Sequence, residues 1–276
     1  MHLHVRARVA PPNGTFAPHC EDSPMQWTAA VPVKVLNEAK SRLGASTALA
    51  FALAQDTITA LLHAPDVTRV VVATHDPQVT AWARAQGCQI VDDRRTPGLN
   101  PAIAAAAGLA PAESGVLAVL ADLPSLTPAG VQEVLRLSDD GTPAFVADAD
   151  GTGTSMWLCG PGHPVVTAFG PQSREAHRAL GARDLVALNP QVPLVQARRD
   201  VDTDHDLAAA IALGVGPATR AAAGTPVTVV CDSDAQVSVV DDNGMRQELP
   251  ATALAGLRHV RAGQRLVLCG GRAYLP

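Results

Sequence analysis

The sequence is poor in lysine, in aromatic side chains and in long apolar runs. Aromatic residues make up only 3% of the 276 residues, so the core must be built from alanine, valine and leucine. A formal net charge of −5 argues against a protein that coats nucleic acid or a membrane surface. No apolar run reaches the roughly 18 residues that a membrane-spanning helix needs. With 47% hydrophobic residues, the sequence predicts a soluble, packed protein.

Three common signatures are absent as well. There is no GxxxxGK[ST] sequence, which excludes a P-loop. The cysteines are scattered without a CxxC spacing, so we expect reduced thiols and a cytoplasmic location. The first residues lack the apolar centre of a signal peptide. We interpret residues 1–24 as a disordered N-terminal extension before a folded part that begins at Met25.

From residue 27 onward, short apolar runs alternate with helical patterns. The runs predict strands at 27–33, 67–74, 88–91, 115–122, 143–149 and 155–159. Helices are expected between and after them, at 46–64, 77–87, 100–110, 127–137, 173–182 and 203–214. This alternation predicts an α/β fold with a mainly parallel sheet and helices on both faces. In such sheets ligands bind beyond the carboxyl ends of the strands.

The C-terminal part has a different pattern. Residues 216–224 are rich in glycine, proline and alanine, and we interpret them as a linker after a domain spanning 25–215. Residues 225–276 contain short alternating runs and a "DDNG" hairpin signal. They predict a small β-barrel-like module.

Both lysines lie in one segment, "VPVKVLNEAKSRLG" at 31–44, directly after the first predicted strand. Lys34, Lys40 and Arg42 therefore gather at the edge of the sheet where ligands bind. Ammonium groups are compact charges suited to a polyphosphate, and a guanidinium can bind two phosphate oxygens at once. A solvated basic turn before a helix is the alternative.

Carboxylates occur at the ends of two other segments. Asp122 ends an apolar strand in "LADLP", where a buried carboxylate needs a cationic partner. Asp200 and Asp202 lie in "RRDVDTDHDL" before a helix, and either residue is a candidate to complete a Mg²⁺ site with Asp122. A helix cap or turn is the alternative for Asp122. Asp204 and Asp206 are expected in the first helical turn, where the helix dipole alone favours them.

Two loops of small residues complete the candidate site. "DGTGTS" at 150–155 and "FGPQS" at 169–173 combine glycines, which allow close backbone approach, with hydroxyls that can donate to an anion, at Thr152, Thr154, Ser155 and Ser173. Asn100 begins a predicted helix, where it either caps the helix or faces a nucleotide. His75 and Asp76 follow the second strand and face a base or ribose, or form a turn. Plain turns would also explain either loop.

These segments together resemble a known family. "PVKVLNEAKSRL", "LADLP", "DGTGTS", "FGPQS" and "RDVDT" occur in the order seen in the 2-phospho-L-lactate/phosphoenolpyruvate guanylyltransferases, over about residues 26–215. These enzymes make the guanylylated precursor of the deazaflavin coenzyme F-420. The resemblance implies a nucleotidyltransferase fold of the glycosyltransferase-A type. "KVLNEAKSRL" stands where sugar-nucleotide pyrophosphorylases carry a glycine-rich loop.

The resemblance also implies roles for individual residues. Lys34, Lys40 and Arg42 would hold the phosphates of GTP. Asp122, with Asp200 or Asp202, would bind Mg²⁺. Phosphoenolpyruvate would be bound by Thr154 or Ser155, Gly170 and Ser173.

The expected reaction joins GMP from GTP to the phosphate of the acceptor and releases pyrophosphate. The resemblance favours phosphoenolpyruvate as the acceptor, with 2-phospho-L-lactate as the alternative. Other readings are a molybdopterin guanylyl- or cytidylyltransferase of the same fold, or a non-catalytic adaptor that binds GTP or RNA. A pyrophosphate-release assay with GTP and CTP would separate the two enzymes.

The tail resembles the cold-shock-like, OB-type modules of some bacterial proteins. Nucleic-acid binding by OB folds uses exposed aromatic side chains, yet Tyr274 is the only aromatic residue in 225–276. We therefore expect the module to pack or dock rather than bind RNA. A homodimer is left open.

Overall fold

The computed structural model describes residues 25–36, 47–95, 97–138, 140–223, 225–232, 236–241, 244–253, 260–269 and 272–274. The predicted extension 1–24 lies outside these ranges, and so do Ser46, Lys40 and Arg42. Among the described residues, no helix has both the length and the apolar character needed to span a bilayer.

Seven strands form the larger sheet, in the order β3-β2-β1-β4-β6-β5-β7. Their bounds are β1 Trp27–Pro32, β2 Val67–Ala73, β3 Gln89–Val91, β4 Gly115–Val119, β5 Ala144–Ala147, β6 Thr154–Cys159 and β7 Arg183–Asp184. The β1–β2, β1–β4, β2–β3 and β5–β7 pairs are parallel. Strand β6 is antiparallel to both of its neighbours, β4 and β5. The predicted mainly parallel sheet is confirmed, and β6 is its reversed strand.

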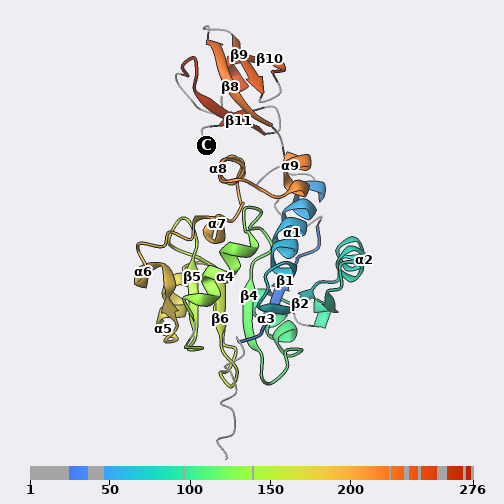
Figure 1. The fold of residues 1–276 in the computed structure, drawn as a ribbon. Coiled ribbons are helices and arrows are strands. Elements are labelled where there is room, and N and C mark those ends of the chain that lie inside the picture. Colours follow the sequence, from blue (N-terminus) through green and yellow to red (C-terminus); the bar gives the residue numbers. More distant parts are fainter. Residues whose placement is uncertain are drawn as a thin grey trace, which may run out of the picture.

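Helices cover both faces of this sheet, as predicted (Figure 1). Alternate side chains of β1 enter different cores: Ala29 and Val31 pack with α1, α2 and α4, whereas Ala30 packs with α3. The bounds of the helices are α1 Thr47–Leu62, α2 Pro77–Ala85, α3 Leu99–Ala107, α4 Pro128–Arg136, α5 Ser173–Ala179, α6 Leu185–Leu188, α7 Val195–Arg198, α8 Asp204–Leu213 and α9 Pro217–Ala223, with a 3₁₀ turn at Asp93–Arg95.

Side chains at the helix ends explain where two of the helices begin. Helix α2 starts after Asp76, whose carboxylate accepts from the backbone N–H groups of Gln78 and Val79. Helix α8 starts after Thr203, which forms a capping box with Asp206. The structural role predicted for Asp206 is therefore confirmed.

The segment interpreted as a linker contains a helix. Residues 217–223 form α9, and the Asp56 carboxylate of α1 accepts from the backbone N–H groups of Ala218 and Thr219. A third apolar cluster joins α1, α8 and α9. The glycine- and alanine-rich composition hid this helix because small residues favour a linker as readily as a tightly packed helix.

Five strands form a second, antiparallel sheet in the order β10-β9-β8-β11-β12. They are β8 Thr225–Asp232, β9 Gln236–Asp241, β10 Arg246–Pro250, β11 Arg265–Cys269 and β12 Arg272–Tyr274, and a 3₁₀ turn lies at Ala251–Ala253. The pairing of β9 with β10 confirms the hairpin predicted at "DDNG". Figure 1 shows these strands gathered beyond α8 and α9.

Candidate active site

One edge of the larger sheet collects most of the predicted site residues that the structure describes. Lys34 follows the carboxyl end of β1, and Asp122 follows that of β4. Because β6 is reversed, its first residue, Thr154, lies beside the carboxyl end of β5, where it pairs with Ala147. The carboxyl ends of parallel strands are where ligands bind in such sheets. The reversed strand therefore adds its amino end to the same edge.

The basic segment is described as far as residue 36. Lys34 is exposed at the sheet edge, two residues beyond β1. Farther along this segment, the backbone N–H of Leu36 donates to Oδ2 of Asp76 at 3.1 Å. Asp76 thus caps α2 and holds the start of the basic loop with the same carboxylate. Of the two roles expected for Asp76, contact with a base or ribose and a place in a turn, the structure shows the turn. Lys40 and Arg42 lie outside the described residues, so their positions beside Lys34 stay a prediction.

The other residue singled out after β2 is His75. Its Nδ1 lies 2.6 Å from Oδ1 of Asp93, and the His75 side chain is 38% exposed. The pair joins the end of β2 to the 3₁₀ turn after β3. Its part in nucleotide binding stays a prediction.

The two acidic segments are joined by a backbone hydrogen bond. The backbone N–H of Val201 donates to the backbone carbonyl of Asp122, which follows β4, at 3.1 Å. Asp200 and Asp202 are the neighbours of Val201 in the chain, so they lie on either side of this bond. The pKa of Asp200 is raised to about 7, first by burial and then by the charges of Asp122, Asp148 and Asp202. A carboxyl group that resists ionisation beside other carboxylates is stabilised in its charged form by a cation.

Arg198 places this acidic segment beside β5. Its Nε and Nη2 donate to the backbone carbonyl of Asp148 at 3.2 and 2.8 Å, and its own carbonyl accepts from the N–H of Ala149. Burial lowers the pKa of Arg198, and the nearby Arg174 charge acts in the same direction. A cavity of about 570 Å³ is lined by Ala149, Arg198 and Arg199 together with other residues of α7 and α8.

The donor set at the acidic edge fits Mg²⁺ chemically, since it consists of carboxylate oxygens. Among the described residues, however, no three histidine, cysteine, aspartate or glutamate side chains are arranged to hold a metal ion by themselves. A Mg²⁺ ion held by one or two carboxylates and by substrate phosphates does not need such a set. The acidic edge is thus compatible with an ion that arrives with its nucleotide.

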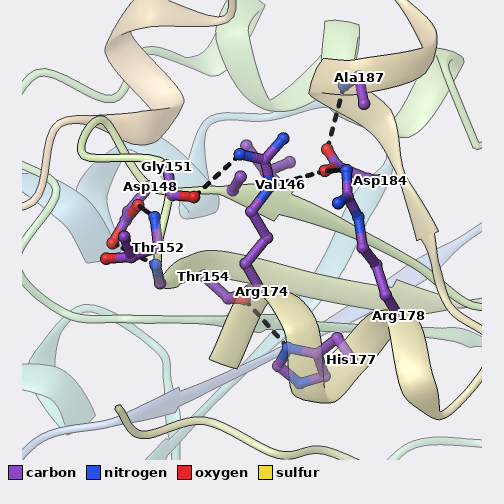
Figure 2. Close-up of polar contacts among 12 residues, drawn as sticks. Val146, Asp148, Gly151, Thr152, Thr154, Arg174, His177, Arg178, Asp184 and Ala187 are labelled. Carbon is purple, nitrogen blue, oxygen red and sulfur yellow. Dashed lines mark hydrogen bonds and ion pairs between the residues drawn. The ribbon is translucent and has the colours of Figure 1, made fainter. Parts of the chain in front are cut away.

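Asp148 shapes the first small-residue loop, and sequence reasoning missed it. Its carboxylate accepts from the backbone N–H of Thr152 at 3.0 Å (Figure 2). It also accepts from the backbone N–H of Gly153 at 2.8 Å. A Cβ at position 153 would collide with this carboxylate, so glycine is required there. The "ADAD" spacing gave no signal that separates Asp148 from an ordinary turn aspartate.

The structure distinguishes the two hydroxyls at the start of β6. Ser155 is fully buried, and its Oγ donates to the backbone carbonyl of Val146 at 3.3 Å. The Oγ1 of Thr154 lies 3.0 Å from Nδ1 of His177, on the side of the sheet where α5 packs. Thr154 retains 3% exposure at the edge of the sheet. Thr154 is therefore the better placed of the two to meet a ligand.

Asn100 fixes the second small-residue loop. Its Nδ2 donates to the backbone carbonyl of Phe169 at 2.9 Å, and its Oδ1 accepts from the Phe169 N–H at 2.8 Å. The helix cap is Gly98, without a side-chain cap bond, so the expected alternative that Asn100 caps this helix is wrong. Gly170, which follows Phe169 in this loop, has a φ of 144°, a backbone conformation that residues other than glycine rarely adopt.

Ser173 begins α5, as predicted, and is 2% exposed. The following residue, Arg174, ties the two loops together: its backbone N–H donates to the carbonyl of Thr152, and its Nη1 donates to the carbonyl of Gly151. Its Nε donates to Asp184, which also accepts from Arg178 (Figure 2). The two loops predicted to bind the acceptor are thus joined by bonds within the chain.

Comparisons with known proteins identify the family. The MobA-like NTP transferase domain family matches residues 51–192. A phosphoenolpyruvate guanylyltransferase from Thermomonospora curvata is 44% identical over 210 residues, which cover 73% of this chain and 90% of the relative. One from Streptomyces coelicolor is 44% identical over 209 residues, covering 72% and 96%. The chain belongs to the phosphoenolpyruvate guanylyltransferase family. The resemblance seen in the sequence is confirmed.

Membership in this family makes the chain a nucleotidyltransferase enzyme with a nucleotidyltransferase-like α/β fold. A solved nucleotidyl transferase from Methanothermobacter is 15% identical, with a TM-score of 0.40 over 64% of this chain and 92% of the other. That likeness is too distant to support an argument, and the assignment depends on the sequence relatives.

Proposed function

We propose that this chain transfers GMP from GTP to the phosphate of phosphoenolpyruvate and releases pyrophosphate. Its membership in a family of phosphoenolpyruvate guanylyltransferases supports this assignment. The observation that carries it is the shared sheet edge: the segment of Asp200 is bonded to Asp122 after β4, and Thr154 begins the neighbouring strand β6. Such an edge brings a metal-bound triphosphate next to a phosphorylated acid. The product would be the guanylylated precursor of coenzyme F-420.

The acceptor needs no general base. Its phosphate monoester has a second pKa of about 6, so it is already an anionic nucleophile near pH 7. One acceptor oxygen attacks the α-phosphorus of GTP, and the bond from that phosphorus to the leaving pyrophosphate breaks. The chain must bring two polyanions together and stabilise the charge that moves onto the leaving group.

Lys34, Lys40 and Arg42 would hold the triphosphate through this change of charge. Lys34 supports this role because it is exposed where the β1 strand ends, beside the edge that carries Asp122. An ammonium group is a compact charge that can follow the charge onto the pyrophosphate. Asn100 would act on the nucleotide only through the Phe169 backbone to which it is bound.

Asp122, with Asp200 or Asp202, would hold Mg²⁺. The raised pKa of Asp200 supports a cation here, since burial and the neighbouring carboxylates penalise its ionised form. Bound Mg²⁺ would neutralise phosphate charge between the two substrates. Asp200 is partly buried whereas Asp202 is exposed, which favours Asp200 as the more constrained ligand.

Thr154, Gly170 and Ser173 would bind the acceptor. The Thr154 hydroxyl and the backbone around Gly170 supply donors for phosphate or carboxylate oxygens. The Ser155 hydroxyl is used on the backbone of Val146, which weighs against it. Phosphoenolpyruvate and 2-phospho-L-lactate differ only near the carbon that carries the phosphate, so both would meet the same donors.

Product analysis by mass spectrometry tests this function. The protein is incubated with Mg²⁺, with GTP or CTP, and with phosphoenolpyruvate, 2-phospho-L-lactate or 3-phosphoglycerate in turn. We expect a GMP adduct of phosphoenolpyruvate and an equal amount of pyrophosphate. Transfer of CMP, or of GMP to another acid only, would contradict the proposal. A matched reaction with EDTA tests the need for the metal ion.

We also propose that residues 225–276 form an OB-like barrel that packs or docks rather than binds RNA. The antiparallel β8–β12 sheet supports this assignment, as does the absence of aromatic residues other than Tyr274. A cytoplasmic location is supported by the buried free thiols of Cys88 and Cys159. RNA binding that weakens steeply with salt would contradict the docking role. Light scattering of the full chain would test the homodimer.

A further inference from the structure

His177 lies at the junction of the three segments proposed to bind the acceptor. The ring is fully buried between Phe145 and Phe169, with centroid distances of 5.6 and 5.1 Å. Its Nδ1 is 3.0 Å from Oγ1 of Thr154 (Figure 2). Its Nε2 is 2.9 Å from the backbone nitrogen of Ala168, two residues before Gly170. Ser173 stands one turn earlier on the same helix.

The bond from Ala168 fixes where the ring carries its proton. A backbone N–H can only donate, so Nε2 of His177 must accept and carries no hydrogen. Burial lowers the pKa of His177 to about 4, although a hydrogen bond to the backbone of Ser173 acts in the opposite direction. The ring is therefore neutral near pH 7, with its one hydrogen on Nδ1. That N–H faces the Thr154 hydroxyl and the Ser173 carbonyl.

This tautomer orients the Thr154 hydroxyl. Because Nδ1–H donates, Oγ1 of Thr154 accepts, and the hydroxyl hydrogen is directed to a different partner. Threonine has few side-chain rotamers, so fixing its oxygen also restricts where that hydrogen can point. Thr154 lies at the start of β6, on the edge of the sheet proposed to meet the acceptor. A phosphate or carboxylate oxygen there would complete the bond.

We propose that His177 is a positioning residue of the acceptor site, which holds the Thr154 hydroxyl as a donor toward the phosphorylated acid. The same ring holds the backbone before Gly170 through Ala168. The inference rests on the proposed function, in which Thr154, Gly170 and Ser173 bind the acceptor. His177 itself touches no substrate, since the ring is buried behind Thr154 and Phe169.

Two substitutions separate the two ring nitrogens. His177→Gln keeps an oxygen that can accept near the Nε2 position but places no donor near Nδ1. His177→Asn keeps an amide N–H near the Nδ1 position but does not reach Ala168. We expect His177→Gln to raise the KM for phosphoenolpyruvate about tenfold, the loss of one hydrogen bond. His177→Asn should raise it less than threefold, and the KM for GTP should change less than twofold in both.

A double-mutant cycle with Thr154→Val tests whether His177 acts through the hydroxyl. Thr154→Val alone should raise the KM for phosphoenolpyruvate about tenfold. Adding His177→Gln to Thr154→Val should then change it less than twofold, because the bond is already gone. Multiplying effects would overturn the proposal, as would equal effects of the glutamine and asparagine variants on both substrates. Thermal unfolding of each variant shows whether it is folded under the assay conditions.

The tautomer can be measured on the unaltered protein, which keeps the proposal falsifiable if the variants do not fold. Long-range ¹H–¹⁵N correlation spectra distinguish a histidine protonated on Nδ1 from one protonated on Nε2. We expect one histidine that does not titrate between pH 5 and 8 and carries its hydrogen on Nδ1. A proton on Nε2, or a charged ring at pH 7, would overturn the proposal.

The outcomes also separate this inference from the proposed function. If the protein transfers GMP only to another acid, the acceptor assignment is wrong, and the cycle is measured with the acid that is used. If phosphoenolpyruvate is guanylylated but the effects multiply, the function stands and the positioning role falls. If no phosphorylated acid is used, both are wrong.

Discussion

We call the residues around Thr154, Phe169 and Ser173 the acceptor side of the site, and Asp122, Asp200 and Asp202 the acidic side. On the acceptor side the polar side chains bind one another, whereas on the acidic side carboxylates of like charge lie near one another. His177, Arg174 and Asp184 each hold a neighbouring loop or helix by hydrogen bonds within the chain. Asp200 instead has its pKa raised to about 7 by burial and by Asp122 and other carboxylates. The acceptor side is pre-organised by the fold. We expect a bound cation to stabilise the charged form of the acidic side.

The acidic side should therefore show the largest catalytic effect. We expect Asp122→Asn to lower kcat by about 1000-fold, because the site would lose a carboxylate that is proposed to hold Mg²⁺ beside the triphosphate. The measurement is pyrophosphate release at saturating GTP and at increasing Mg²⁺. Asp206→Asn is the control: it alters the α8 capping box and the ion pair with Arg199, and it should cost about 1 kcal/mol of stability with little change in kcat. An Asp122→Asn enzyme with a tenth of the normal rate would break the comparison.

The basic segment should show the next largest effect. Lys34→Ala should lower kcat/KM for GTP about 100-fold, equivalent to about 3 kcal/mol of transition-state stabilisation. Lys34→Arg should recover part of this loss because the charge is kept but its geometry changes. Arg136→Ala removes an exposed cation of α4 that pairs with Glu133, and we expect no measurable effect on rate. Equal rates for Lys34→Ala and the unaltered enzyme would remove Lys34 from the site.

The acidic side could be read from the sequence more completely than the acceptor side. Asp122 and Asp200 each follow or precede a recognisable element, and the sheet edge brings such ends together. The direction of β6 carries no such signal, because a short buried apolar run has the same pattern in either direction. The bond between Asn100 and Phe169 joins positions 69 residues apart and leaves no local pattern. His177 lies in a short helix without a motif.

On the acceptor side, loss of a charge should affect stability more than the metal requirement. Asp184→Asn weakens bonds from Arg174 and Arg178 to a carboxylate that is only 5% exposed. We expect the free energy of unfolding in urea to fall by about 2 kcal/mol. Asp140→Asn, at an exposed ion pair with Arg183, should cost less than about 1 kcal/mol. A changed Mg²⁺ requirement in Asp184→Asn would mean that the two sides are not separate.

The smallest effect is the pH dependence that the buried ring of His177 gives to stability. Its pKa of about 4 lies below the ordinary value of 6.5, so the unfolded chain takes up a proton in this range that the folded chain does not. The contribution of His177 to the free energy of unfolding is therefore greatest above about pH 6.5 and falls as the pH drops toward 4. Between pH 7 and 5.5 this residue should lower the free energy of unfolding by about 1 kcal/mol. Subtracting the same urea titrations of His177→Gln isolates this contribution, because Asp200 titrates in both proteins. Identical slopes with pH would mean that His177 is charged or exposed in the folded chain, and the acceptor side would then lack the neutral ring that orients Thr154.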